Sequence, residues 1–499
     1  MAQEKQNDVD VRSLPEVPKD VLPRGTYPPI RYRDLPAALP WYKMLGPSII
    51  VAGLAIGSGE LIFWPYLTYT YGLAIIWAGI VGVTTQFFIN MEIERYTLLT
   101  AETSVAGFNR LWKGFGAIFL ICVVIPNMWP GWVAGSAKLL AWTLHPSASD
   151  EAIGGYQRIY AIMSVILCGA FLVLSPVVYK FMEKLQEALV AFVFIVLIIT
   201  VFTVTKFETF GLWLKSAGDF SYLKEINAAN AWPTLLGAIA YAGMGGMTNM
   251  VQGHYIREKG FAMGRYAGKI VSPITGGEDI KFAEAGFFFK LTPENIAKWR
   301  QWWRSANLEH FLSFLCLTAI SIVLLSFLAY NTVYGVEGYG KGIAFIRGEA
   351  DILSQQFGGF FRYVFLLMGW AILFTSQIGV LDLFSRLSTD IIKWSWLREQ
   401  EQWTESRIYF VIVIGLTVFA VIVFAGGLRD PRTLLTISAA LNGIVMFLYS
   451  FLLLYMNRLK LPKEVRASTL RTVAMVWSVV FFGVFSILTI KVTIEKLFG

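Results

Sequence analysis

Long apolar stretches recur along almost the whole chain, and short polar segments separate them. Each stretch has about 20 predominantly apolar residues, the length that an α-helix needs to cross the hydrocarbon core of a bilayer. We therefore predict an all-α integral membrane protein with about eleven transmembrane helices. The predicted spans are 46–70, 73–95, 115–143, 158–178, 185–206, 233–256, 308–334, 361–388, 408–427, 432–456 and 468–491.

Basic residues gather in every second segment between these spans. They follow the second, fourth, sixth, eighth and tenth spans, for example at Arg95, Lys180, Arg257, Arg386 and Arg458. Basic loops remain on the cytoplasmic side of a membrane. We therefore predict a multi-pass protein of the cell membrane whose amino terminus is cytoplasmic and, because the span count is odd, whose carboxyl terminus is external.

Composition excludes several classes of function. Of the 499 residues 56% are hydrophobic, and the formal charge of +8 lies mainly between the spans, without the basic stripe that nucleic acid would require. The three cysteines all fall inside apolar stretches, which suits neither disulfides nor a thiolate metal site. The chain has no P-loop, HExxH or GxSxG motif. We expect a protein that is not an enzyme, has no cofactor or nucleic-acid partner, and acts as a monomer in the lipid bilayer.

Two regions lie outside the apolar pattern. Residues 1–44 are polar and Pro-rich, with no apolar region of a signal peptide, and predict a flexible cytoplasmic tail before the transmembrane domain, 45–499. Residues 257–307 form a long cytoplasmic insert with a Gly/Pro-rich part at 272–277 and then a helix start at Thr292. Its tryptophans alternate with basic residues, which favours an amphipathic helix on the inner leaflet. A regulatory gate is the alternative.

The first span contains a weak point at Gly57, Ser58, Gly59 and Glu60. Each glycine costs a helix about 1 kcal/mol relative to alanine. Glu60 lies half-way along the span, and an ionisable group inside a membrane marks a functional site. The structural alternative is that the glycines allow close helix packing and that Glu60 pairs with a donor from another helix.

The sixth span repeats this pattern, with three glycines between Tyr241 and Met247. Two interrupted helices at corresponding places in two halves of a chain indicate the substrate site of a secondary transporter. Spans 1–5 and 6–10 would then be the two inverted repeats, with helices 1 and 6 broken. A receptor or scaffold is a third possibility, but neither function requires two weakened buried helices.

Several segments resemble the natural resistance-associated macrophage protein (Nramp) family of metal-ion transporters. The opening Leu45–Val51 (LGPSIIV) is similar to the start of that family's first helix, and Gln86–Glu94 and Lys184–Ala191 are similar to its second and fifth. The resemblance covers roughly residues 40–255 and, more faintly, the rest of the chain. It implies a LeuT-type fold, a metal substrate and transport of the symport type.

The signature residues of that family differ in this chain. The family's Asp-Pro-Gly-Asn falls on Gly57–Glu60, so Glu60 is the one carboxylate, and its Met-Pro-His falls on Tyr241–Gly243. Met244 and Met247 lie a helical turn away. The acids of the family's proton route fall on Asn127 and Pro130. We therefore expect weak proton coupling or none.

The remaining ligands favour a hard divalent ion such as Mg²⁺ or Mn²⁺. Glu60 is the predicted metal ligand, and carbonyl oxygens of 55–58 and 241–244 would complete the site, with amide oxygens from the eighth and tenth spans. The predicted substrate-binding residues are Gly57, Ser58, Gly59, Glu60, Tyr241, Gly243, Met244, Gln377 and Asn442.

A second resemblance is local. Ile56–Gly59 followed by Pro65 resembles the first-helix motif of amino acid–polyamine–organocation transporters, and Ala240–Gly243 resembles their sixth helix. It implies an amino acid or small organic amine as substrate, with its carboxylate held by the amides of Gly57–Gly59. Glu60 beside those amides would favour a cationic or zwitterionic amine.

Three further groups of charged residues have structural interpretations. Asp382 and Arg386 are four residues apart and are expected to pair on one helix face. Glu92, Glu94 and Arg95 are expected to form an interfacial cluster. His254 is expected at a solvated helix end.

Overall fold

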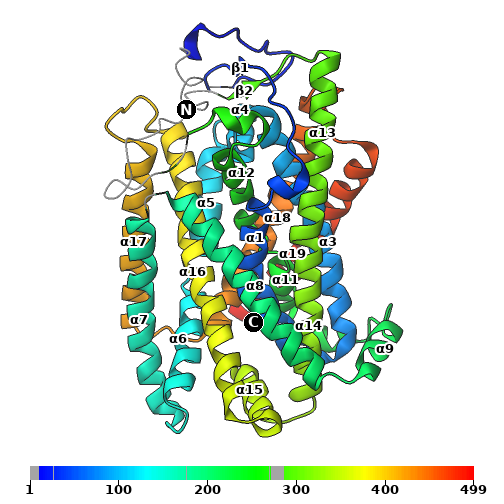
Figure 1. Ribbon diagram of the computed structural model, residues 1–499, viewed down its shortest axis with the longest axis vertical. Coiled ribbons are helices and arrows are strands. Elements are labelled where there is room, and N and C mark those ends of the chain that lie inside the picture. Colours follow the sequence, from blue (N-terminus) through cyan, green and yellow to red (C-terminus); the bar gives the residue numbers. More distant parts are fainter. Residues whose placement is uncertain (1–10, 26, 176, 269, 271–285, 499) are drawn as a thin grey trace.

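The predicted spans form one bundle of long helices. The computed structural model describes residues 11–25, 27–175, 177–268, 270 and 286–498, without the side chains of residues 58 and 496–498. Most long helices run along the longest axis of the molecule, and short helices and loops cover both ends (Figure 1). Apolar stretches become helices because a bilayer offers no water to their peptide groups, which a helix satisfies internally.

Short helical turns, labelled η when they are 3₁₀ or π, connect or interrupt the longer helices. The first part of the chain forms η2 (Val11–Ser13), β1 (Arg31–Tyr32), η3 (Trp41–Lys43), α1 (Pro47–Ala55), η4 (Ile56–Phe63), α2 (Trp64–Tyr71), η5 (Leu73–Ile75), α3 (Ile76–Thr100), α4 (Ser104–Leu111), α5 (Phe115–Asn127), α6 (Gly131–Leu144), α7 (Asp150–Leu174), α8 (Val178–Val204), α9 (Phe207–Lys215) and α10 (Tyr222–Ala228). The second part forms α11 (Trp232–Tyr241), α12 (Met247–Lys259), η6 (Ala262–Tyr266), β2 (Phe287–Phe288), α13 (Pro293–His310), η7 (Phe311–Cys316), α14 (Leu317–Thr332), α15 (Ala344–Phe357), α16 (Gly359–Ser395), α17 (Glu405–Ala425), α18 (Pro431–Tyr455), η8 (Met456–Lys460) and α19 (Thr469–Phe498).

The number of spans agrees with the sequence pattern. Over the described residues, ten helices are long and apolar enough to cross a membrane. The other predicted span, 233–256, corresponds to α11 and α12, which a turn at 242–246 divides into helices of 10 and 13 residues. The protein is therefore a multi-pass, all-α membrane protein, and its sixth helix is broken at the predicted residues.

The seventh span is much longer than predicted. α13, η7 and α14 form one helix from Pro293 to Thr332. Trp299 and Trp302 are buried, and the Trp302 indole donates to the carbonyl oxygen of Pro36 at 2.9 Å. The prediction of an amphipathic helix on the inner leaflet is therefore wrong, because the chain's own amino-terminal segment covers this face. The Gly/Pro-rich part of the insert, 272–277, lies outside the described residues.

The described part of the amino-terminal segment is packed against the bundle, which differs from the predicted flexible tail. β1 pairs in parallel with β2 from the insert, with Arg31 opposite Phe287. The guanidinium of Arg110 in α4 donates to the carbonyl oxygens of Arg24 and Pro28, each at 2.9 Å. Because Leu22 and Ile30 are buried as well, the segment is held by apolar burial and by hydrogen bonds to its backbone.

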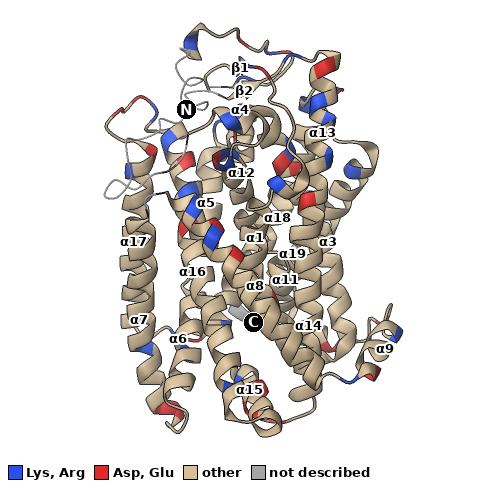
Figure 2. Cartoon of the chain, viewed as in Figure 1, with Lys and Arg blue, Asp and Glu red and all other residues tan. Residues whose placement is uncertain are grey.

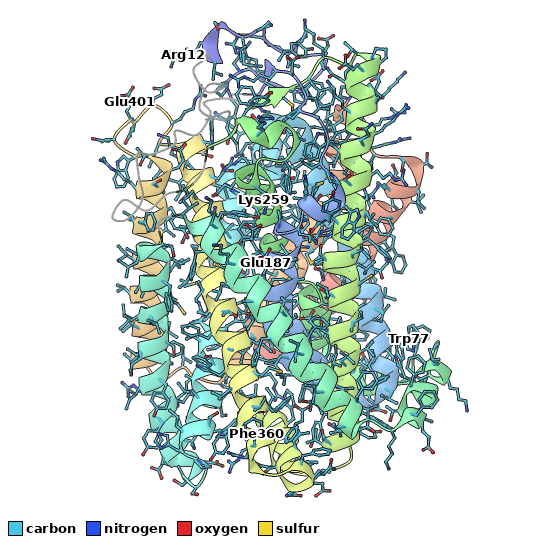
Figure 3. The ribbon with its side chains drawn as sticks, in the orientation of Figure 1. Arg12, Trp77, Glu187, Lys259, Phe360 and Glu401 are labelled. Atoms are coloured by element: carbon cyan, nitrogen blue, oxygen red, sulfur yellow. The ribbon has the colours of Figure 1, made fainter. Side chains whose placement is uncertain are left out.

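The outer surface of the bundle suits a lipid environment. Large apolar side chains are exposed along α8 and α19, for example Phe202 at 80% and Ile487 at 69%. Charged residues gather toward the end that carries β1 and β2, and the other half is largely uncharged until the opposite end, where α9 and α15 carry charges (Figure 2). Lys259 and Glu401 lie in the more charged half, and Phe360 lies at the opposite end (Figure 3).

Buried ion pairs join the helices at the charged end. Arg386 contacts both carboxylate oxygens of Asp382 at 2.8 Å, as predicted, and also pairs with Glu258 of α12. Contrary to the prediction, His254 is fully buried, with Nε2 4.0 Å from the Asp390 carboxylate. α12 packs against α1, α3 and α16, which places His254 inside the bundle, whereas the side chain of Lys259 in the last turn is 26% exposed.

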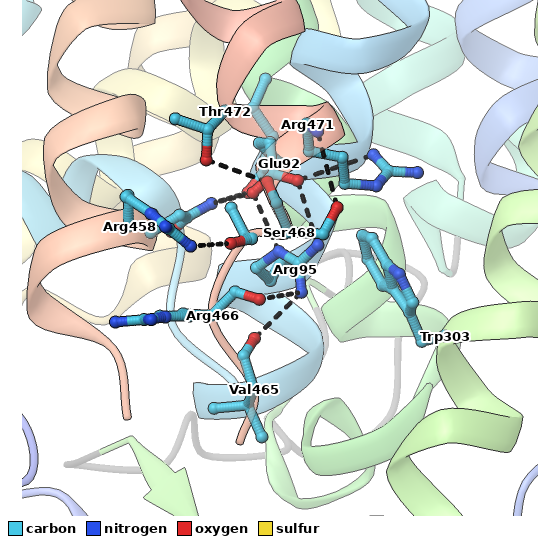
Figure 4. A network of polar contacts seen from close by, with 12 residues as sticks. Glu92, Arg95, Trp303, Arg458, Val465, Arg466, Ser468, Arg471 and Thr472 are labelled. Carbon is cyan, nitrogen blue, oxygen red and sulfur yellow. Dashed lines mark hydrogen bonds and ion pairs between the residues drawn. The ribbon is translucent and has the colours of Figure 1, made fainter. Parts of the chain in front are cut away.

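The predicted cluster at the end of α3 divides into two. Arg95 pairs with Glu92 at 2.9 Å, and its guanidinium lies 4.0 Å from the centre of the Trp303 ring (Figure 4). Arg471 of α19 reaches the other oxygen of Glu92 at 3.5 Å. Both acids are buried rather than interfacial, and Glu94 contacts a different set of residues.

Candidate functional site

The break in the sixth helix is a tight turn made by residues with positive φ. Gly243, Met244 and Gly246 have φ of 124°, 57° and 84°. Glycine adopts these angles at little cost, whereas Met244 is a strained exception. Met244 is fully buried, and a Cβ on Gly243 would lie 2.6 Å from the ring of Phe314. The turn is therefore closely packed as well as conformationally specific.

The carboxyl end of α11 is capped by a side chain from another helix. The Nε2 atom of Gln86 in α3 donates to the carbonyl oxygens of Ile239, Ala240 and Ala242, at 2.9, 2.9 and 3.1 Å. The last carbonyls of a helix lose their usual partners, and a buried carbonyl without a partner is costly. The Ala240 carbonyl also accepts a hydrogen bond from the N–H of Gly245 at 2.7 Å. Gln86 therefore stabilises the break.

The amino end of α12 is capped in the same way. Asn442 of α18 accepts a hydrogen bond from the backbone N–H of Met247 at 3.0 Å. Its Nδ2 atom donates to the side chains of Asn127 at 2.9 Å and Tyr241 at 3.1 Å. The Tyr241 hydroxyl also lies 2.6 Å from Ser438. Asn442 thus joins the third, sixth and tenth spans at the break.

The first span differs from the expected broken helix. Residues Ile56–Phe63 form wide π-helical turns between α1 and α2, so the span continues from Pro47 to Tyr71 without an unwound segment. The N–H of Trp64 donates to the carbonyl oxygen of Gly59, five residues earlier. The irregularity lies at the predicted residues, but as a π bulge, a feature common at functional sites.

Both glycines of the π segment permit close contacts with neighbouring helices. A Cβ on Gly59 would lie 2.5 Å from the carbonyl carbon of Tyr241, where the break in the sixth helix begins. A Cβ on Gly57 would lie 2.6 Å from the Cβ of Ser376 in α16. Because real side chains do not approach this closely, only glycine fits at these two positions. The two irregular helices therefore meet backbone to backbone.

Glu60 lies within this segment and is fully buried. Neither of its carboxylate oxygens has a hydrogen-bond partner among the described residues. The π segment packs against α11, α14 and α16, which enclose it. A charged carboxylate at the centre of a membrane helix costs about 2.5–3.5 kcal/mol or more. Something positive must therefore accompany Glu60 when it is ionised.

Gln377 of α16 has a different neighbour. Its side-chain oxygen accepts a hydrogen bond from the backbone N–H of Val133 at 3.3 Å, where α6 begins. It is adjacent in sequence to Ser376, whose hydroxyl has no hydrogen-bond partner among the described residues. The structure thus brings Gly57, Gly59, Tyr241 and Asn442 together, whereas the side chain of Gln377 bonds to α6.

Sequence reasoning did not identify Gln86 or Ser376 as parts of this site. Gln86 belongs to a segment that resembles the Nramp family but was not singled out there. Its signal was the amide itself, because an amide in an apolar span indicates an interhelical hydrogen bond. Ser376 had no comparable signal, because serine is common in membrane helices. Its position is significant because its side chain lies against Gly57 in the folded protein.

Sequence comparison identifies no relative: no family model matches the chain, and no curated protein matches it significantly. Solved structures do match. A mutant form of the manganese transporter of Eremococcus coleocola has a TM-score of 0.65 at 12% identity, covering 96% of this chain and 91% of that one. The same transporter in complex with an aromatic bis-isothiourea substituted compound gives a TM-score of 0.64 at 12% identity, with 97% and 92% covered.

A more distant likeness is to MhsT in complex with L-phenylalanine. Its TM-score is 0.52 at 14% identity, covering 90% of this chain and 97% of that one. At such low identity these likenesses establish the fold alone. They confirm, at the level of the fold, the resemblance that the sequence segments indicated: the chain has the LeuT-type fold shared by the manganese transporter and MhsT.

Proposed function

We propose that this protein is a secondary transporter that moves a divalent metal ion, Mn²⁺ or Mg²⁺, across the membrane. The substrate site would lie where the π segment of the first span meets the break in the sixth. The proposal rests on one observation, the fully buried carboxylate of Glu60 with no hydrogen-bond partner among the described residues. We infer that a divalent cation is the partner of this buried carboxylate.

The chemistry around Glu60 favours a hard ion. Two oxygen atoms lie against its neighbours in sequence, the Tyr241 backbone carbonyl against Gly59 and the Ser376 hydroxyl against Gly57. Carboxylate, carbonyl and hydroxyl oxygens suit Mg²⁺ and Mn²⁺ better than softer ions. The solved structures of similar fold named as a manganese transporter support this substrate class.

Proton coupling by an acidic route in the third span has no support in this chain. Asn127 stands at one of the two positions in question and bonds to Asn442 at 2.9 Å. We therefore infer that metal movement is weakly coupled to protons or uncoupled.

The charge distribution in Figure 2 supports a cytoplasmic position for the amino-terminal end.

The second candidate substrate is an amino acid or small organic amine. The fold likeness to MhsT, whose structure holds L-phenylalanine, favours it. However, binding a carboxylate at Gly57–Gly59 requires exposed backbone amides, and Ile56–Phe63 remains helical. A metal ion is therefore the better-supported substrate.

A ligand screen on the purified protein tests the proposal. Mn²⁺, Mg²⁺ and a panel of amino acids and amines would be compared by thermal shift, because a ligand that binds only the folded state raises its melting temperature. We expect Mn²⁺ to raise the melting temperature, and to do so less in Glu60→Gln. A shift with an amine or amino acid but not with either metal would favour the second candidate.

A further inference from the structure

A second buried cluster lies at the charged end of the bundle, away from the central site. Glu94 of α3 and Glu309 and His310 of α13 each place one ligand-type atom within 4.8 Å of the others. Ser48 at the start of α1 and Gln252 of α12 complete the cluster, and all five side chains are buried. The cluster thus joins the first and sixth spans, which carry the two irregular segments, with the second and seventh spans.

Polar atoms converge on the imidazole of His310. Its Nδ1 atom lies 2.8 Å from Ser48 Oγ, 3.1 Å from Gln252 Nε2 and 3.6 Å from Glu94 Oε1. Ser48 also donates to Glu309 Oε2 at 2.6 Å. One ring nitrogen carries one proton or one lone pair and cannot satisfy all these neighbours. A cation bound among these groups would satisfy them together.

Two features indicate that the cluster is prepared for a ligand. The His310 ring stacks with the rings of Phe314 and Phe87, with centroid distances of 4.5 and 5.6 Å, which restricts its orientation. The amide of Gln252 lies inside the cluster, fully buried, yet among the described residues its Oε1 atom has no hydrogen-bond partner. Turning this amide over would present its oxygen to a cation at the cluster, an exchange of O and N that leaves its shape unchanged.

The charge of the cluster also calls for a cation. Over the described residues, neither Glu94 nor Glu309 forms an ion pair with a lysine or arginine. Arg471 and Lys259 interact electrostatically with Glu94 and Glu309, respectively, but Arg471 is paired with Glu92 and Lys259 with Glu183. One divalent ion would balance the charge of these two carboxylates when both are ionised.

We propose that Glu94, Glu309 and His310, with Ser48 and Gln252, form a second cation site for a first-row transition-metal dication. Two carboxylates and an imidazole are a mixed oxygen and nitrogen set that such ions accept. Ser48 and Glu60 are twelve residues apart on the first span, about 18 Å at 1.5 Å per residue. The second site is therefore separate from the central one, and its existence does not depend on the proposed function.

Mn²⁺ bound to the purified, untagged protein is a direct probe of this site. The chain has three histidines, and His145 and His254 lie in other surroundings. Pulsed electron paramagnetic resonance detects the nitrogen of an imidazole bound to Mn²⁺. We expect this coupling in the wild type, its loss in His310→Gln, and its retention in His254→Gln and Glu60→Gln. Glu309→Gln should weaken this Mn²⁺ site by roughly tenfold or more, because charged ligands set the affinity.

The matched control is Glu349→Gln in α15, which changes an equally buried carboxylate outside the cluster and should leave the coupling intact. Wild-type Mn²⁺ without imidazole coupling, or coupling that survives in folded His310→Gln, would overturn the second site. If His310→Gln does not fold, Glu94→Gln and Glu309→Gln test the site instead. Mn²⁺ that binds both variants as tightly as the wild type, with the same imidazole coupling, would overturn the second site. Failure of the central site would instead appear as unchanged Mn²⁺ transport in Glu60→Gln.

Discussion

Gly59 of the first span lies against the backbone carbonyl of Tyr241, the last residue before the break in the sixth span. This contact joins the two irregular helices at the residues where each departs from regular α geometry. The absence of a side chain on Gly59 therefore sets how closely the two helices approach. Glu60 follows directly in sequence, so the contact also fixes where the buried carboxylate lies.

Replacing Gly59 with alanine should separate these helices. The added Cβ would lie 2.5 Å from the Tyr241 carbonyl carbon, and overpacking of this kind costs about 1–3 kcal/mol. We expect a lower melting temperature in detergent and impaired Mn²⁺ binding. The control is Gly415→Ala in α17, where an added Cβ meets nothing within 4 Å and stability should hold. Equal effects at both positions would contradict the close contact.

Gln86 should be required for the break in the sixth helix. Gln86→Ala removes the donor to three carbonyl oxygens, of which that of Ala240 keeps the N–H of Gly245 at 2.7 Å. Leaving a buried carbonyl unpaired costs about 1–3 kcal/mol. Thr84→Ala is a matched change on the exposed face of the same helix, where the hydroxyl bonds only to its own helix. Unfolding in detergent should show a clear loss for Gln86→Ala and little for Thr84→Ala. The reverse order would rule out the capping role.

Arg386 should be the most important cation at the charged end. Its side chain is almost fully buried between Asp382 and Glu258, and breaking a buried ion pair on one side costs about 3–5 kcal/mol. Arg386→Met should therefore destabilise the protein strongly. Lys491→Met breaks the exposed pair with Glu495 and should change stability by less than about 1 kcal/mol. Similar denaturation midpoints for the two variants would refute this.

The orientation in the membrane can be tested at two exposed positions. Single cysteines replacing Glu401 and Phe360 lie at opposite ends of the molecule (Figure 3), in a background whose three native cysteines are changed to alanine. With a cytoplasmic amino terminus, an impermeant thiol reagent added to intact cells should label position 360 and not 401. Labelling of 401 alone would reverse the orientation.

Sequence reasoning gave the membrane class, the approximate spans and the place of both irregular segments. Hydrophobic length and glycine content carry that information directly. It did not give the form of the irregularities, because glycines weaken a helix without deciding between a π bulge at Gly59 and a turn at Gly243. It also misplaced Trp302 and His254. Both side chains are buried by segments that are distant in sequence, and the local hydrophobic pattern carries no information about those segments.

Mn²⁺ uptake into proteoliposomes tests the proposed role of Glu60 as the metal ligand. Glu60→Gln keeps the shape of the side chain and removes the charge that a hard divalent ion requires. The control is Glu349→Gln, which also neutralises a fully buried carboxylate. We predict that uptake falls by about tenfold or more in Glu60→Gln and is unchanged in Glu349→Gln, with both proteins folded. Undiminished uptake by the Glu60→Gln protein would show that Glu60 is not the metal ligand.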